Sequence, residues 1–176
     1  MQEVQPGLFL EKLAGRHVRQ LTAFDCGHED TNAFIRNAAF AYQNENLGRT
    51  YLLVNSEGQI HAFVTIAMSV LKFKDEELAL NLGSLDKPSQ IPALRIARLG
   101  TSSKIQGKGI GSRALDSITG IFQSLQHHVG SRVIAVDAVS ERVQWYAKRG
   151  FKSVYSDVTG RTTVPMYFMP PRDGQS

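Results

Sequence analysis

The sequence predicts a mixed α/β fold with a central sheet of about six or seven strands. Strand-like and helix-like patterns alternate through the middle of the chain, which favours at least one parallel or near-parallel pair of strands. The chain has 176 residues, 42% of them hydrophobic, and this composition argues against a disordered chain. We therefore expect one domain that covers residues 1–176.

The N-terminal part of the chain contains a short strand and a helix. Leu8 to Leu13 alternates weakly between apolar and polar residues, as a half-buried strand does. Apolar residues then recur at spacings of three and four from Ala33 to Ala41, the period of an amphipathic helix. Asp30 or Thr31 is expected to cap the N-terminus of this helix.

A hairpin and a further strand are expected next. Arg49 to Asn55 and Gln59 to Phe73 are β-rich runs on either side of the turn Ser56-Glu57-Gly58, and this arrangement predicts a β-hairpin. Lys74 to Pro92 is polar and is expected to be a long loop or a short broken helix. Ala93 to Thr101 again has the composition of a strand.

The second half of the chain repeats this alternation. Ile110 to about Gln126 has the apolar spacing of a helix, and Val133 to Val139 is a nearly continuous apolar strand. Ser140 is a candidate N-cap for another helix. Two strand-like runs, Lys152 to Asp157 and Thr163 to Met169, complete the predicted sheet.

Composition excludes several classes of protein. The single cysteine, Cys26, excludes a disulfide framework and a cysteine-based zinc cluster, and it indicates a reducing, cytoplasmic environment. No secretory signal is visible, and the longest stretch without a charged residue is shorter than the roughly 20 residues that span a bilayer. The modest net charge of +4 favours a solvated basic surface over a dedicated site for a polyanion, which stays open as the alternative.

A glycine-rich loop, Gln106 to Gly111, lies between a predicted strand and a predicted helix. Glycines let backbone amides approach a ligand closely, and a helix N-terminus offers unpaired N–H groups. Lys104 and Lys108 add positive charge, so the loop is a candidate pyrophosphate site. A Walker loop is excluded because Gly109 follows Lys108. Taken alone, the loop is equally typical of a flexible turn.

A second motif, Trp145 to Phe151, follows one helix and one strand later and contains Tyr146, Lys148 and Gly150. Together the two motifs resemble the GNAT superfamily of acetyl-CoA-dependent N-acetyltransferases over residues 93–151. The resemblance implies the GNAT fold, with a mixed six- to seven-stranded sheet flanked by about four helices.

A narrower resemblance covers most of the chain and is to the GNAT toxins of bacterial toxin–antitoxin pairs. It rests on Phe24 to Gly27, the β run Phe63 to Val70, and Ile91 to Ala93 leading into Ala97 to Gly100. Such toxins acetylate the amino group of aminoacyl-tRNA and stop translation. The chain differs where the family usually reads Arg-Leu-Ala-Val-Asp, at Arg98 to Ser102, and where it usually has a tyrosine pair, at Ala62-Phe63.

The resemblance implies acetyl-CoA as co-substrate and no metal. Tyr146 is the expected catalytic residue, beside the sulfur of the leaving thiolate, and a backbone N–H of the strand end stabilises the oxyanion. The candidate cofactor-binding residues are Leu99, Gly100, Thr101, Gln106, Gly107, Lys108, Gly109, Ile110, Gly111 and Ser140. The candidate substrate-binding residues are Arg98, Lys148 and Arg149.

Two other functions stay open at this point. One is acetylation of a small-molecule or protein amine, and the other is a non-catalytic module that binds acyl-CoA or RNA. The expected partners are acetyl-CoA, aminoacyl-tRNA, a cognate antitoxin and a second copy in a homodimer, with no membrane association. His127, His128, Cys26 and Asp137 are expected to have structural roles.

Overall fold

A computed structural model describes residues 2–72 and 90–171. The predicted mixed α/β fold is confirmed, with an eight-stranded sheet of order β1-β2-β3-β4-β5-β6-β8-β7. The chain forms two compact units. Unit 1 contains Met1–Ala67 and Ile96–Ile121, and unit 2 contains Met68–Arg95 and Phe122–Ser176. Strands β4 (Ile60–Lys72) and β5 (Gln90–Thr101) each contribute residues to both units.

The strands of unit 1 follow one another in an antiparallel meander. β2 (Leu8–Lys12) pairs with β3 (Arg49–Asn55), and β3 pairs with β4, so the predicted hairpin is confirmed. The sheet has one strand more than the sequence predicts, because β1 (Gln2–Gln5) pairs with β2. The turn between them contains Gly7 at φ +74°, a conformation that glycine adopts without strain.

The helical segment predicted around Ala33 is longer than its apolar pattern indicates. It comprises α2 (Glu29–Ala33), a π-helical stretch (Phe34–Ala38) and α3 (Ala39–Asn44). The expected cap at Asp30 or Thr31 is wrong: His28 is the N-cap, and Asp30 lies in the first turn, where a carboxylate suits the positive end of the helix. The sequence does not predict the preceding helix α1 (Gly15–Leu21), because two turns are too short to show a period.

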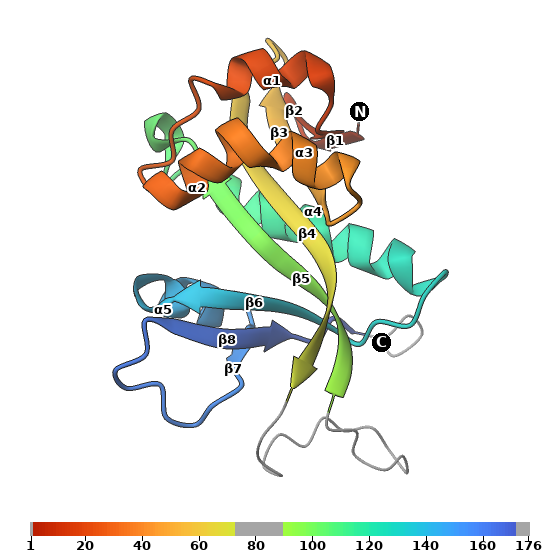
Figure 1. The fold of residues 1–176 in the computed structure, drawn as a ribbon, viewed down its shortest axis with the longest axis vertical. Helices are drawn as coiled ribbons and strands as arrows, with labels where there is room; N and C mark the ends of the chain where they lie inside the picture. Colours follow the sequence, from red (N-terminus) through yellow and green to blue (C-terminus); the bar gives the residue numbers. More distant parts are fainter. Residues whose placement is uncertain (1, 73–89, 172–176) are drawn as a thin grey trace. The chain divides into compact units, whose positions relative to one another are not determined.

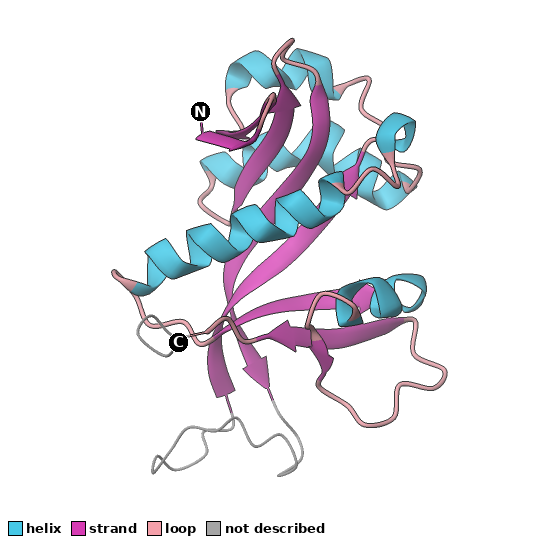
Figure 2. Ribbon diagram, turned by 180° about the vertical axis from the view of Figure 1, so that it is seen from behind, coloured by secondary structure: helices cyan, strands magenta, loops and turns pink. Residues whose placement is uncertain are grey.

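Two apolar cores lie on opposite faces of the unit 1 strands. Leu52, Val54 and Phe63 pack with residues of the N-terminal helical region. Leu53 and Ala62, which point to the other face, pack with α4 (Ile110–Gln126), the helix predicted at this position. Figures 1 and 2 show helices α1–α3 on one face of these strands and α4 on the other.

Unit 2 is built on β6 (Val133–Val139), which has the bounds that the sequence predicts. It pairs antiparallel with β8 (Thr163–Phe168), which in turn pairs with the two-residue strand β7 (Lys152–Ser153). The strand predicted to reach Asp157 is therefore much shorter. A third apolar core, which includes Val133, Ala135 and Tyr167, belongs to this unit.

Two further expectations in unit 2 need correction. Ser140 is not a helix cap: it begins a 3₁₀ turn (Ser140–Arg142), and Arg142 is the N-cap of α5 (Val143–Ala147). The predicted loop Lys74 to Pro92 ends earlier than expected, because Gln90 to Pro92 already belong to β5. Residues 74–89 of that segment lie outside the described residues. Among the described residues, no helix has the length and apolar character needed to cross a membrane.

Candidate functional site

The end of strand β5 supplies the first group of candidate residues, Leu99 to Thr101, all in unit 1. Gly100 is buried against Phe63: a Cβ at position 100 would lie 2.6 Å from Cε1 of that ring and 3.3 Å from Sγ of Cys26. A larger residue at this position would displace the ring or the strand. Glycine therefore lets this backbone lie directly against the core.

The glycine-rich loop follows a short 3₁₀ turn (Ser103–Ile105) and leads into α4. Gly107 and Gly109 both have φ +80°, and a Cβ at either would meet no atom within 4 Å. Within the described part of the chain, the backbone amides of residues 106–111 donate to no backbone acceptor outside α4. The loop thus presents free N–H groups and open space at the positive end of a helix of 17 residues.

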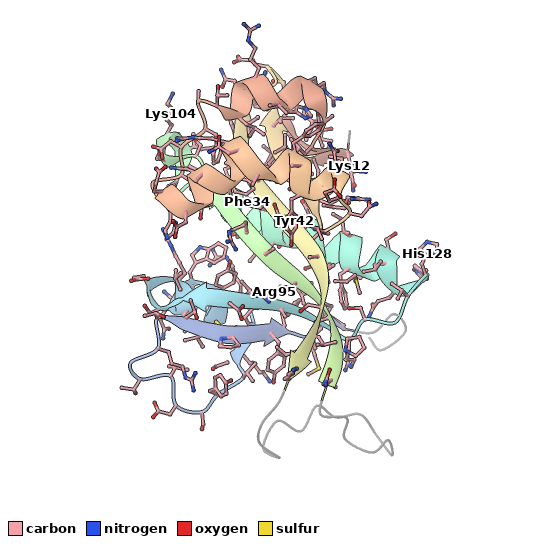
Figure 3. The ribbon with its side chains drawn as sticks, viewed as in Figure 1. Lys12, Phe34, Tyr42, Arg95, Lys104 and His128 are labelled. Carbon is pink, nitrogen blue, oxygen red and sulfur yellow. The ribbon has the colours of Figure 1, made fainter. Side chains whose placement is uncertain are left out.

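Two lysines add positive charge to this loop. Lys104 and Lys108 are both exposed, and Lys104 points away from the strands into solvent (Figure 3). Arg113, on the first turn of α4, donates to Oε1 of Gln5 and lies 3.6 Å from Asp116. Its charge is therefore partly neutralised, and the two lysines are the stronger electrostatic attraction for an anion at the loop.

The base of the loop is held by a turn that belongs to the resemblance but whose contacts the sequence did not predict. We call Asp25, Cys26 and Gly27 the Asp25 turn. Asp25 accepts hydrogen bonds from the Ser103 amide (2.9 Å) through its carbonyl and from the Ser103 hydroxyl (3.0 Å) through its carboxylate. The Gln106 side chain donates to the Cys26 carbonyl at 2.8 Å, so this side chain positions the loop.

The carboxylate of Asp25 is stabilised in its charged form. The Gly27 amide donates to it at 2.9 Å, and the side chains of Asn32 and Ser103 donate as well. These hydrogen bonds lower the pKa of Asp25 below its usual value, the Gly27 amide contributing most. The Asp-x-Gly spacing is typical of such a side-chain-to-backbone turn and is the local signal in the sequence.

The candidate substrate residue Arg98 precedes the strand end and is exposed. Its guanidinium lies 5.5 Å from the ring centroid of Phe34, on the π-helical stretch. Phe34 in turn contacts Tyr42 edge-to-face, with centroids 5.8 Å apart (Figure 3). Arg98 is therefore a cation on an aromatic surface.

Tyr146 is buried in α5 of unit 2. Its ring meets Trp145 and Phe151 edge-to-face at centroid distances of 4.9 and 5.3 Å. Burial raises its pKa to about 12, although Arg142 and Arg149 act in the opposite direction. In the described part of the chain the hydroxyl has no hydrogen-bond partner in the protein. Tyr146 is therefore a neutral phenol that is available as a donor.

The other candidate residues of unit 2 differ in their exposure and in the contacts that their side chains make. Arg149 donates to the Trp145 carbonyl at 2.7 Å, and its guanidinium stacks 3.8 Å from the Trp145 ring centroid. Lys148 is exposed. Ser140 is also exposed, and its amide donates to the Thr162 carbonyl. The structure thus groups Arg98–Thr101 with Gln106–Gly111 in unit 1, whereas Ser140, Tyr146, Lys148 and Arg149 belong to unit 2.

The residues expected to have structural roles lie in an ion pair, in an apolar core or at the end of a helix. Asp137 on β6 forms an ion pair with Arg95 on β5. Cys26 is buried in the unit 1 core, and burial raises its thiol pKa. His127 and His128 continue the C-terminal turn of α4. No group of three or more potential metal ligands occurs among the described residues.

Comparisons with known proteins agree on one fold. No family model matches the chain. A tRNA-acetylating toxin of Mycobacterium tuberculosis is 23% identical over 149 residues, which are 85% of this chain and 84% of that protein. A structure of AtaT complexed with acetyl-methionyl-tRNAfMet has a TM-score of 0.76 and 21% identity, covering 92% of this chain and 94% of that chain.

A mutant of KacT gives a similar result, with a TM-score of 0.77 and 18% identity over 93% of this chain and 95% of that chain. The likeness to toxins of this kind, which the segments Phe24–Gly27, Phe63–Val70 and Ile91–Gly100 indicated, is confirmed, and the chain has their fold.

Proposed function

We propose that the chain is an N-acetyltransferase that moves the acetyl group of acetyl-CoA to the amino group of aminoacyl-tRNA. The observation that carries this proposal is the glycine-rich loop, with free amides and open space at the N-terminus of α4. The likeness to a tRNA-acetylating toxin and to AtaT, whose structures include one bound with acetyl-CoA and one complexed with acetyl-methionyl-tRNAfMet, supports both the donor and the acceptor.

The residues of unit 1 fit the pyrophosphate and pantetheine parts of acetyl-CoA. A phosphate needs N–H donors and room for its oxygens, and the loop offers both around Gly107 and Gly109. Lys104 and Lys108 attract the anion. The backbone of Leu99 to Thr101 would hold the pantetheine arm by main-chain hydrogen bonds and direct one N–H at the thioester carbonyl. When bound, acetyl-CoA supplies an activated acetyl group to a neutral amine.

Tyr146 would stabilise the leaving sulfur by donating a hydrogen bond to it. Its pKa of about 12 lies well above the ~8.5 of a thiol, so complete transfer of its proton is uphill by about 5 kcal/mol. The phenol therefore keeps its proton in the resting protein. A hydrogen bond to an ionised partner is stronger than one to a neutral group, and this favours the transition state over the ground state.

The acceptor amine would need no strong base from the protein. The α-amine of an aminoacyl ester is more acidic than an ordinary amine, so a neutral fraction is present near pH 7. Asp137 is engaged in an ion pair with Arg95, so its carboxylate is not free to serve as that base. The exposed Lys148 would contact tRNA phosphate.

The same comparisons support a protein partner for this chain. Structures of AtaT bound to the C-terminus of the antitoxin AtaR, and of a KacTA–DNA complex, are among the neighbours. We propose that a cognate antitoxin controls this chain, that it acts as a homodimer, and that it works in the cytoplasm, where charged tRNA is found.

The experiment uses labelled acetyl-CoA, total aminoacylated tRNA and the purified protein, with Tyr146→Phe beside it. Label should enter the tRNA-bound amino acid, and the variant should lose about 10²–10⁴-fold in kcat, the usual effect of removing a general acid or equivalent donor. Acetyl-CoA affinity, measured by calorimetry, should stay within about twofold in the variant, because the loop of unit 1 is untouched.

Label on small amines or on protein, with none on RNA, would redirect the proposal to those acceptors. Equal turnover by the wild type and the variant would contradict the role of Tyr146. Acetyl-CoA binding without any transfer would indicate a binding module.

A further inference from the structure

We propose that Asn32 is a positioning residue for acetyl-CoA, because it fixes the Asp25 turn from which the glycine-rich loop is held. The inference rests on the proposed function and assigns a role to a residue outside the loop. Asn32 touches no candidate cofactor residue itself and acts through its neighbours.

Asn32 uses both ends of its amide on the Asp25 turn. Its side chain is buried, at 3% exposure, in helix α2. Its Oδ1 accepts from the Cys26 amide at 2.9 Å, and its Nδ2 donates to Oδ1 of Asp25 at 2.7 Å. The amide side chain supplies this acceptor and this donor together, without a charge.

The Asp25 turn then reaches both groups of candidate cofactor residues in unit 1. Its carbonyls accept from the Ser103 amide and from the Gln106 side chain, which also donates to the Thr101 carbonyl at 3.1 Å. On the strand side, the Cys26 sulfur lies 3.3 Å from where a Cβ of Gly100 would be. One buried amide thus supports both the loop and the strand end.

This support matters for binding because, among the described residues, the side-chain hydrogen bonds that hold the loop are those of Gln106 to the Cys26 and Thr101 carbonyls. A Cβ at either of the loop's two positive-φ glycines would meet no atom within 4 Å, so the loop conformation depends on the contacts at its base. A loop already held in its binding conformation loses less entropy when a ligand binds. Removing the Asn32 hydrogen bonds should therefore weaken acetyl-CoA binding more than it slows the chemical step.

The test substitutes Asn32→Asp in the full chain. When ionised, aspartate has nearly the same shape but cannot donate, and it places a second carboxylate beside Asp25, so binding is measured at a pH at which both carboxylates are ionised. We expect the acetyl-CoA Kd and KM to rise about tenfold or more, with kcat at saturation within about twofold of wild type. In the ligand-free protein, amide hydrogen exchange at Ser103 and Ile105, whose amides donate to the carbonyls of Asp25 and Ser102, should become faster.

Asn37→Asp is the matched control, because Asn37 is exposed on the same helical segment and its side chain makes no hydrogen bond among the described residues. It should leave the Kd and the exchange rates unchanged. If Asn32→Asp does not fold, Ser103→Ala removes only the hydroxyl contacts with Asp25 at an exposed position. That variant should raise the Kd about threefold.

The possible outcomes distinguish a failure of the role proposed for Asn32 from a failure of the proposed function. Wild-type protein that binds no acetyl-CoA would overturn the proposed function and the inference with it. Wild-type binding with an unchanged Kd in the folded Asn32 or Ser103 variant would overturn the inference alone. A fall in kcat with unchanged Kd would also contradict it.

Discussion

Tyr146 combines two properties at the scale of a single residue. Its ring is part of an aromatic group with Trp145 and Phe151, and its hydroxyl is the proposed hydrogen-bond donor to sulfur. The same burial that packs the ring raises the pKa of the phenol to about 12. Burial of the ring and the pKa of the phenol are therefore coupled. The pH dependence of the free energy of unfolding can detect this coupling without any substrate.

Alkaline pH should destabilise the wild type more than Tyr146→Phe. The folded protein binds the tyrosine proton more tightly than the unfolded chain does, where the pKa is ~10, so this stabilisation is complete below pH ~10 and is lost as pH rises towards 12. By pH 11 the wild type should have lost about 1.4 kcal/mol more than the variant. Urea unfolding of both proteins at about pH 9, 10 and 11 measures this, and parallel pH curves would show an ordinary pKa.

Gly100 and Phe63 show which residue-scale features a sequence can reveal. Both stand where the chain differs from the usual pattern of the toxin family, and the structure places them in contact. The Phe63 ring fills the space that a Cβ at position 100 would need, so the two differences form one packing unit. Their positions were visible in the sequence, but their coupling needed the pairing of distant strands.

At the scale of elements, strong local patterns predicted structure well. β3, α4 and β6 have the bounds that their apolar spacing indicated, because each is long enough to show its period. β1 and α1 are too short for this. The Asp25 turn has a local sequence signature, but the sequence gives no local sign of its role. Its partners lie far along the chain: Ser103 is 78 residues after Asp25, and Gln106 is 80 residues after Cys26.

The glycine-rich loop and α4 each contain a glycine whose substitution by alanine should have the opposite effect on stability. Gly107→Ala places a Cβ on a residue at φ +80° and should lower the free energy of unfolding by about 1–2 kcal/mol and weaken acetyl-CoA binding. Gly120→Ala lies inside α4 with open space around it and should stabilise the protein by about 0.5–1 kcal/mol.

Urea unfolding and calorimetry with acetyl-CoA measure the two effects. Binding that is unaffected by Gly107→Ala would show that the loop conformation is not needed for the cofactor.

At the scale of the whole molecule, charge should control the use of tRNA. Lys148 is exposed, whereas Arg149 is engaged with Trp145, so Lys148 is the better candidate for a phosphate contact. Lys148→Glu should raise the KM for aminoacyl-tRNA, and the slope of log KM against log salt should fall by about 0.7–0.9 for each phosphate that the protein no longer neutralises. Acetyl-CoA affinity should not change.

Lys12→Glu, on the exposed part of β2, makes the same change in net charge and serves as the control. Equal effects of the two substitutions would indicate attraction by net charge rather than a phosphate bound at Lys148. Measurement over a range of salt concentrations distinguishes the two, because the slope changes only when a bound phosphate is released from the protein.

The hydrogen bonds beneath the glycine-rich loop also bear on the order of folding. They join residues 78 and 80 positions apart in the chain, with helices α2–α3 and the β3–β4 hairpin between them. Contacts of such high sequence separation form late, after the intervening elements have reduced the entropy of closing the loop. During synthesis, the Asp25 turn leaves the ribosome well before its partners. A nascent or partly folded chain therefore lacks these supports of the glycine-rich loop, and we expect the proposed binding of acetyl-CoA only when unit 1 is complete.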